Sequence, residues 1–347
     1  MKALIIRTNL KEGLSAIERA GGEGSSLPIL KNVLIEAEGA KIRLLATNLE
    51  IAAIYSASGK IIQAGKVAVP LNTLVSVISG MQTERLNLEV KGSALEITSD
   101  NYRATLQGSP ADDFPIVPRV KTGEQIELSA ELLREALAQV VASTQISDLR
   151  PELSSVLFDF SVDELKLAAT DSFRLSERSI PKNQFTTTRE EAFRALVPLK
   201  TAHELIRILK GDGPLRLFYD QSQILFQTDQ VELISRLVEG NFPDYTAIVP
   251  KKFGGEAIID RQEFMNALKL ASIFGSRTSE IKIGVATSKK ALEISSADQA
   301  VGENTYVLPA KLEGKIPEIL FNWRYLVDAL KILKGEEIFL GVNENGE

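Results

Sequence analysis

The stretch Lys41-Ile42-Arg43-Leu44-Leu45-Ala46-Thr47-Asn48 decides the fold, because it alternates apolar and polar residues and recurs twice further along the chain. The second copy is ELKLAATD at residues 164–171, and the third is ALEISSAD at residues 291–298. Alternation with a period of two is typical of half-buried antiparallel strands. The repeat predicts three copies of one module arranged along the chain.

Each copy follows a segment whose apolar residues have helical spacing. These residues are Leu10, Leu14 and Ile17, then Leu133, Leu137 and Val140, then Phe264, Leu268 and Ala271. Ser129 and Asp260 precede the second and third of these segments, and both residue types are favoured helix N-caps. The pattern predicts a helix at the start of every module.

A second helical pattern follows each copy of the stretch. Pro70 and Pro198 stand where proline is expected in the first turn of a helix, while Gly80 and Gly211 stand where glycine often ends one. The third copy of this helix begins at Asn322. Each module thus has the order helix, strands, helix, strands. This order predicts an α+β fold whose antiparallel sheet carries two helices on one face.

The length and composition predict a folded chain of several domains. A length of 347 residues fits two or three domains, because a domain usually holds roughly 100 to 200 residues. Hydrophobic residues make up 44% and charged residues 25%, as in soluble globular proteins. We place the three modules at residues 1–121, 122–252 and 253–347, with the boundaries in segments that contain proline and glycine.

The third module is expected to be incomplete. Its second helix begins at Asn322, and two more strand-like runs follow the equivalent helix in each of the first two modules. By that comparison the C-terminus lacks about 20 residues of the repeat. Asn345-Gly346 is a strong hairpin-turn signal that a returning strand should follow. We therefore expect the run 338–342 to form an exposed apolar edge strand.

The composition excludes several kinds of functional site. The chain has no cysteine and one histidine, His203, so disulfides, thiol catalysis and metal sites built on these residues are not expected. Acidic pairs such as Asp112-Asp113 and Glu190-Glu191 come without a phosphate loop or a nucleophile motif, which argues against an enzyme. No apolar run reaches the ~20 residues of a membrane span, and the N-terminus does not resemble a signal peptide. We expect a cytoplasmic protein without a cofactor.

Four stretches carry a resemblance to a known family. They are Leu27-Pro28-Ile29-Leu30-Lys31-Asn32-Val33, Leu45-Ala46-Thr47-Asn48-Leu49-Glu50, Ala169-Thr170-Asp171-Ser172-Phe173-Arg174-Leu175 and Gly240-Asn241-Phe242-Pro243-Asp244-Tyr245. Together they resemble the bacterial DNA polymerase III β subunit family, the sliding clamps, over nearly the whole chain. The resemblance implies a DNA clamp fold in which a head-to-tail homodimer forms a ring of six similar modules. Helices would line the central hole, and sheets would lie outside.

The resemblance also implies a function and a set of partners. Duplex DNA would pass through the hole without sequence-specific contacts, and the ring would act as a processivity factor on the bacterial nucleoid. The expected protein partners are DNA polymerase III, clamp loader subunits and other proteins that carry a clamp-binding motif. A non-catalytic scaffold that never surrounds DNA is the alternative, and ring closure discriminates between the two.

In the family, partner proteins insert a short linear peptide into a pocket between the second and third domains. The matching positions here are Leu153, Thr170, Ser172, Phe173, Arg174, Leu175, Pro243, Ile248 and Tyr325. The residues expected to face DNA in the channel are Arg150, Lys200, Arg207, Lys210, Arg324, Lys331 and Lys334. The positions that match the subunit interface are Leu106, Ile273 and Phe274.

Other roles remain open for some of these residues. Ordinary core packing is the alternative for Leu153, Leu175 and Phe274. A solvated strand position is the alternative for Arg174.

The chain departs from the family's pattern at individual contact positions. Ser172 and Phe173 stand where the family usually has glycine and histidine. Ala247 stands where it often has arginine, and Gly24 occupies a loop position facing DNA that is frequently arginine. The distribution of charge agrees with the overall resemblance, because the whole chain has a net charge of −6 whereas the six helix segments together are net positive. That sign suits helices that face DNA and an exterior that repels it.

Overall fold

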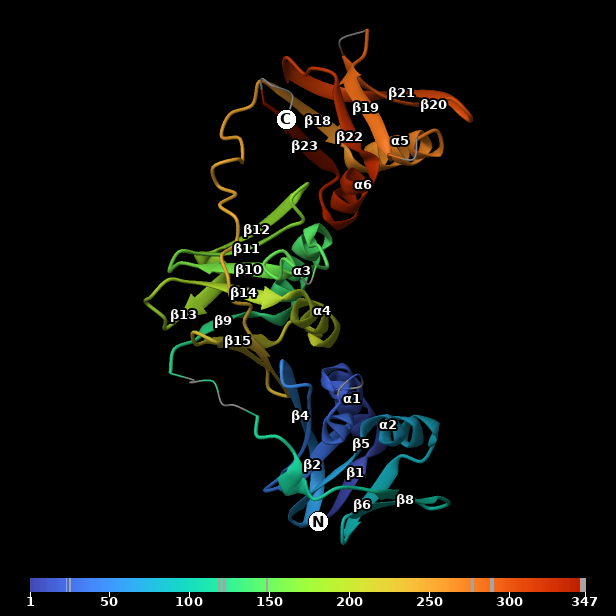
Figure 1. The fold of residues 1–347 in the computed structure, drawn as a ribbon, viewed down its shortest axis with the longest axis vertical. Coiled ribbons are helices and arrows are strands. Elements are labelled where there is room, and N and C mark those ends of the chain that lie inside the picture. The colour runs from blue at the N-terminus through green and yellow to red at the C-terminus, as the bar shows by residue number, and fades with distance from the viewer. Residues whose placement is uncertain are drawn as a thin grey trace. The chain divides into compact units, whose positions relative to one another are not determined.

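The structure, a computed structural model, describes residues 1–22, 24, 26–117, 120, 123–147, 149–275, 278–287 and 290–343 (Figure 1). It divides into two compact units. Unit 1 comprises Met1–Asp171 and Glu177–Gly240, and unit 2 comprises Ser172–Ser176 and Asn241–Glu347. The expected module boundary between residues 121 and 122 lies outside the described residues and stays a prediction.

The first module consists of two successive halves with the same order, which is a strand, a helix and three strands. The first half holds β1 (Lys2–Ile6), α1 (Arg7–Ile17), β2 (Asn32–Glu38), β3 (Lys41–Thr47) and β4 (Ile51–Gln63). The second half holds β5 (Gly65–Pro70), α2 (Leu71–Gly80), β6 (Arg85–Lys91), β7 (Ala94–Thr98) and β8 (Arg103–Gln107). The module thus has the predicted order of helix, strands, helix, strands, with a short strand added before each helix.

The second module repeats this order with one additional short strand, β13. It holds β9 (Ile126–Ser129), α3 (Ala130–Val140), β10 (Ser155–Phe160), β11 (Glu164–Thr170), β12 (Leu175–Pro181), β13 (Phe185–Thr187), β14 (Phe193–Pro198), α4 (Leu199–Ile208), β15 (Pro214–Tyr219), β16 (Gln223–Gln227) and β17 (Val231–Arg236). The third module holds β18 (Gly255–Asp260), α5 (Arg261–Ile273), β19 (Glu280–Val285), β20 (Ala291–Asp298), β21 (Gly302–Gly314), β22 (Ile319–Asn322), α6 (Trp323–Ile332) and β23 (Glu337–Val342). The predicted α+β fold of three modules, each built on antiparallel strands with two helices, is confirmed.

The repeated stretch forms β3, β11 and β20, each paired antiparallel with a hairpin neighbour. Ile42, Leu44 and Ala46 of the first copy have no exposed surface. In the third copy Ser296 takes the place of this alanine and is still buried. Its hydroxyl donates a hydrogen bond to the carbonyl oxygen of Ala271 at 2.7 Å. The polar substitution is therefore compatible with the core, because the buried hydroxyl is satisfied.

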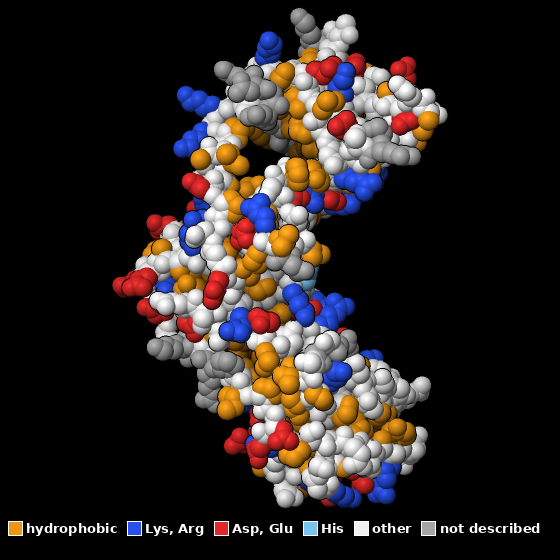
Figure 2. Space-filling model, viewed as in Figure 1, with side chains coloured by type: hydrophobic (Ala, Val, Ile, Leu, Met, Phe, Trp, Pro, Cys, Tyr) orange, Lys and Arg blue, Asp and Glu red, His pale blue; other side chains and the backbone are white. Residues whose placement is uncertain are grey.

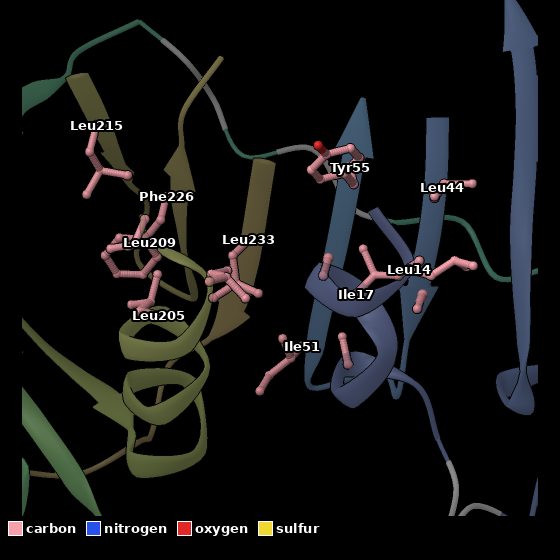
Figure 3. Close-up of a cluster of buried hydrophobic side chains, with 14 of the residues drawn as sticks. Leu14, Ile17, Leu44, Ile51, Tyr55, Leu205, Leu209, Leu215, Phe226 and Leu233 are labelled. Carbon is pink, nitrogen blue, oxygen red and sulfur yellow. The ribbon is translucent and has the colours of Figure 1, made fainter. Parts of the chain in front are cut away.

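The helices pack their apolar sides against the sheets. Leu14 and Ile17 of α1 are buried and point toward the strands that carry Leu44 and Tyr55 (Figure 3). Leu205 of α4 lies in the second module and belongs to the same buried cluster (Figure 3). Burial of apolar surface stabilises such a cluster by roughly 25 cal/mol per Å². Among the described residues, no helix is long and apolar enough to cross a membrane.

The ends of the helices agree with the sequence in part. The predicted caps Ser129 and Asp260 accept hydrogen bonds from the backbone N–H groups of Leu132 and Glu263. Pro70 and Pro198, however, end strands β5 and β14 and occupy the N-cap position, one residue earlier than predicted. The short strands run directly into the helices, and proline fits there because its φ suits an extended residue before a helix.

The predicted glycine positions need correction as well. Gly80 is the last residue of α2 and does not follow it. Gly211 lies three residues beyond the end of α4 at Ile208, where it adopts a φ of 72°. Glycine suits position 211 because it adopts a positive φ easily. It is not, however, the residue that directly ends the helix.

Strands β17 and β4 join the first two modules within unit 1. They pair antiparallel from Val231 opposite Tyr55 to Ser235 opposite Ile51. The sheet of the second module that contains β15, β16 and β17 therefore continues into strands of the first module. Leu233 of β17 and Tyr55 of β4 both reach the buried cluster at this junction (Figure 3).

Strand β23 is one of the two outer strands of the described sheet in the third module. Among the described strands it pairs only with β18, whereas its counterparts β6 and β15 have a strand on each side. Phe339 of β23 is largely exposed, and its ring contacts that of Phe253 at 5.4 Å between centroids. The expected apolar edge strand is therefore present. The expected turn at Asn345-Gly346 lies outside the described residues.

Candidate interfaces for peptide, DNA and a second subunit

Two of the expected peptide-binding residues lie in unit 1. Leu153 has no exposed surface, and its backbone is held by hydrogen bonds to Arg150 and from Gln145. Thr170 ends β11 and is also buried. The structure thus gives Leu153 the core position that was its open alternative, and the peptide-binding role of both residues stays a prediction.

The segment Ser172–Ser176 belongs to unit 2 and carries four more of these residues. Ser172 has a φ of 75°, which glycine adopts more easily, and Phe173 is 82% exposed. The guanidinium of Arg174 lies 3.0 Å from the carboxylate of Asp328 and 4.4 Å from the centre of the Tyr325 ring. Leu175 is partly buried. Arg174 is therefore fixed by α6 and does not extend freely into solvent.

The segment after Gly240 forms an anchored turn in unit 2. The rings of Phe242 and Tyr245 are buried and meet edge to face at 6.0 Å. The carbonyl oxygen of Tyr245 accepts hydrogen bonds from the backbone N–H groups of Ile248 and Val249. Pro243 is partly buried in this turn, whereas Ile248 is exposed. The turn thus holds the apolar side chain of Ile248 in solvent on a fixed backbone. A bound peptide needs such an apolar contact on the protein surface.

Most of the expected DNA-facing residues are exposed. They are Arg150, Lys200, Lys210, Arg324, Lys331 and Lys334. In the second module, basic side chains gather near α4 while acidic ones gather near β13 (Figure 2).

Arg150 donates a hydrogen bond to Glu152 at 3.1 Å. A backbone hydrogen bond lowers the pKa of the Glu152 carboxyl, and the bond from Arg150 lowers it further.

Arg207 differs from the other basic residues of this set. It pairs with Glu204 on the preceding turn of α4, and it donates hydrogen bonds to the carbonyl oxygens of Ser15 and Ala16 at the end of α1. The side chain of Glu204 is only 6% exposed. Arg207 therefore joins α4 to α1 across the junction of the first two modules. A contact with DNA would have to compete with these bonds, and it stays a prediction.

The expected subunit-interface residues lie at strand and helix ends. Leu106 is in β8, which pairs only with β7 among the described strands. Ile273 ends α5 and is exposed, and the ring of Phe274 lies beside Gly302 at the start of β21. Asn304, also in β21, has a buried side-chain oxygen without a hydrogen-bond partner. β8 and the start of β21 each leave one edge without a described partner strand, and the interface role of these residues stays a prediction.

Some candidate residues were missed in the sequence. Asp328 and Glu204 fix two of the expected functional arginines, yet neither was predicted to do so. Tyr325 and Asp328 are three residues apart on α6, so they lie on one face of the helix, and this spacing was a usable signal.

In the described residues, no group of three or more histidine, aspartate and glutamate side chains could hold a metal ion.

Comparisons with known proteins agree over all three modules. The chain matches the DNA polymerase III beta subunit N-terminal domain at residues 1–118, the central domain at 127–244 and the C-terminal domain at 246–345. It is 27% identical to the beta sliding clamp of Synechococcus elongatus, over 99% of this chain and 93% of that protein. It is 28% identical to the beta sliding clamp of Bacillus subtilis, over 97% and 92%. The crystal structure of the Bacillus subtilis DNA polymerase sliding clamp superposes with a TM-score of 0.92 at 25% identity, over 99% and 93%.

Proposed function

The chain belongs to the DNA polymerase III beta subunit family, and from this premise we propose that two copies join head to tail into a closed ring around duplex DNA. As a sliding clamp the protein is a processivity factor for DNA polymerase III. Closure of the ring retains it on DNA, so the protein needs only weak contacts that do not depend on sequence. It would work in the cytoplasm, on the nucleoid, without catalysing a reaction.

The junction of β17 and β4 supports this proposal, because it provides a template for the contact between subunits. β8 holds the same place in the first module as β17 in the second, since each is the third strand after the second helix. The start of β21 likewise corresponds to the start of β4. On the side away from β20, residues 302–306 of β21 pair with no described strand.

The template predicts the register of the contact between subunits. Ala104 of β8 corresponds to Leu233 of β17, because both face the core from the same place in their hairpins. Applying the pairs of β17 and β4 therefore places Ala104 opposite Asn304 and Leu106 opposite Gly302 of a second copy. The buried side-chain oxygen of Asn304, which has no hydrogen-bond partner in the single chain, would then lie at this contact. Ile273, exposed in the single chain, precedes Phe274, whose ring lies beside Gly302, so the same contact would cover it.

The chain has no cysteine, so cross-linking can test the register directly. The double variant Ala104→Cys with Asn304→Cys should form disulfide-linked dimers under mild oxidation, because opposed strand residues have suitable Cβ separations. In the control pair Thr105→Cys with Asn304→Cys, one thiol moves to the other face of β8 and cross-linking should fall strongly. Equal cross-linking of both pairs, or a monomer at micromolar concentration by light scattering, would contradict the ring.

The exposed apolar side chains of unit 2 support a peptide site on the same protein. Phe173 and Ile248 are solvent-exposed on anchored segments, and Arg174 and Tyr325 add polar and aromatic contacts. A linear peptide with apolar anchors suits such a surface. We propose that DNA polymerase III, clamp loader subunits and other motif-bearing proteins bind there. A non-catalytic scaffold is the second candidate, and it would bind the same peptides without retention on circular DNA.

A further inference from the structure

The C-terminus of α1 is capped by a side chain from the neighbouring module. The last carbonyl oxygens of an α-helix have no partner inside the helix, and the last turn of α1 holds no basic residue. Arg207 of α4 supplies both donors and charge: its Nη1 donates a hydrogen bond to the carbonyl oxygen of Ser15, and its Nη2 donates one to that of Ala16 at 3.0 Å. A cation is favoured at this end of a helix, because the helix dipole is negative there.

Glu204 fixes the orientation of the Arg207 guanidinium. Its Oε2 accepts hydrogen bonds from Nε of Arg207 at 3.0 Å and from Nη2 at 2.6 Å. The side chain of Glu204 is 6% exposed and that of Arg207 is 21% exposed, so solvent screens this pair only weakly. The two residues, which we call the latch, therefore form a rigid link between α4 and α1 beside the paired strands β17 and β4.

The helix that replaces α4 at the proposed contact between subunits has no latch. By the template of β17 and β4, that helix is α2, and it faces α5 of the second copy. Both α2 and α4 begin at a leucine that follows a proline, so Ser76 corresponds to Glu204 and Ser79 to Arg207. Both serines are exposed, and the hydroxyl of Ser76 donates a hydrogen bond within its own helix, to the carbonyl oxygen of Asn72 at 2.8 Å.

The helix that replaces α1 at that contact is capped from within its own module. Lys269 of α5 corresponds to Ser15 of α1, and its carbonyl oxygen accepts a hydrogen bond from the hydroxyl of Ser272 at 2.7 Å. The hydroxyl of Ser296 in β20 donates another to the carbonyl oxygen of Ala271. The two ends of α1 and α5 thus differ in the same sense as α4 and α2 do: only the junction inside the chain joins its helices by charged side chains.

We propose that Arg207 is a positioning residue of the ring: its cap on α1 latches the junction inside each chain, and the absence of an equivalent pair in α2 sets how easily the contact between subunits opens. The inference rests on the proposed closed ring. Both kinds of junction pair a strand of one module with a strand of the next, but only the junction inside the chain adds a hydrogen-bonded link between helices. A ring must open to admit DNA, and the weaker of the two junctions yields first.

Transfer of the latch to the contact between subunits tests this difference. In the double variant Ser76→Glu with Ser79→Arg, the new arginine should donate to the carbonyl oxygens of Lys269 and Leu270 on the second copy, because a carbonyl oxygen has two lone pairs. Exchange of subunits between two differently labelled pools, followed by fluorescence energy transfer, should slow roughly fivefold. The reversed variant Ser76→Arg with Ser79→Glu has the same composition but places a carboxylate at the negative end of α5, so its exchange should not slow.

Hydrogen exchange tests the latch inside the chain. Arg207→Gln should raise amide exchange at residues 14–17 of α1 and 231–235 of β17 more than in the strands β6 and β7 of the same unit. His203→Gln, at an exposed position of the same helix, should leave all these rates unchanged. A uniform rise in Arg207→Gln would show a general loss of stability and would overturn the latch.

The two possible failures give different results. A wild-type protein that does not form dimers would contradict the proposed ring, and with it the role given to α2. A wild-type dimer whose subunit exchange is equally fast with and without the transferred pair would leave the ring intact and overturn this inference alone.

Discussion

Leu49 is a leucine in a backbone conformation that favours glycine. Its φ is 76°, and it lies at the position of the repeat that Ser172 occupies in the second module with a φ of 75°. A non-glycine residue in this region costs about 1 kcal/mol or more. Leu49→Gly should therefore raise the free energy of unfolding by roughly 0.5 to 1 kcal/mol, after loss of some side-chain contacts. Urea denaturation measures the change.

Leu27 provides a matched control for this substitution. Leu27 and Leu49 are both 49% exposed, but Leu27 has a φ of −92°. Leu27→Gly should be neutral or destabilising, since it relieves no strain. Equal effects of the two substitutions would show that the positive φ carries no cost. The repeat aligns Leu49 with Ser172. A leucine gives no sign of a positive φ, so the strain could not be predicted from residue type.

Arg207 should matter more for the stability of unit 1 than an exposed lysine of the same helix does. Arg207→Ala removes the partner of the buried Glu204 carboxylate and the donors to Ser15 and Ala16. We expect a loss of about 2 kcal/mol, because a buried charge without its partner is costly. Lys200→Ala on the same helix should change stability by less than about 0.5 kcal/mol. Unfolding curves of both variants test this, and an Arg207→Ala protein of wild-type stability would contradict it.

At the scale of elements, the 3-10 turn Ala111–Asp113 is held to β5 by one exposed ion pair. A hydrogen bond and the charge of Lys66, 2.6 Å away, hold the pKa of the Asp112 carboxyl below its usual range. A carboxyl with a lowered pKa contributes stability above its unfolded pKa, and this contribution is lost as pH falls through the folded pKa. The effect on overall stability should be small, because solvent screens exposed pairs.

NMR titration of the Asp112 carboxyl measures this interaction directly. Lys66→Met should move the pKa of Asp112 upward to its ordinary range. Lys60→Met, on the exposed end of β4, should leave it unchanged. An unchanged Asp112 pKa in Lys66→Met would show that the turn is held by other contacts.

Elements with a long periodic pattern were predictable, and short ones were not. The repeated strand stretch and the caps Ser129 and Asp260 all appear as predicted. Strands β5, β14 and β22 were missed because each has at most six residues and runs directly into a helix. A run this short has no periodicity to separate it from the first turn of the helix that follows.

At the scale of the whole molecule, the repeat predicted the fold, but it could not predict which distant residues meet. Arg174 and Asp328 are 154 residues apart in the sequence, and neither lies in a motif that names the other. The same limit applies to Arg207, which looked like an exposed base on α4 and instead spans to α1. Contacts of this kind depend on how modules pack, and the alternation of apolar residues within a module carries no information about that packing.

Retention on DNA should depend on topology and not on affinity. If the ring is loaded onto nicked circular DNA by a bacterial clamp loader with ATP, it should stay bound at high salt, because screening weakens phosphate contacts without opening a closed ring. Linearising the circle should release the protein from the free ends, and blocking both ends with bulky groups should prevent release. Gel filtration of labelled protein with the DNA measures each case. Equal retention on circular DNA and on linear DNA with free ends would mean that binding, and not encirclement, holds the protein.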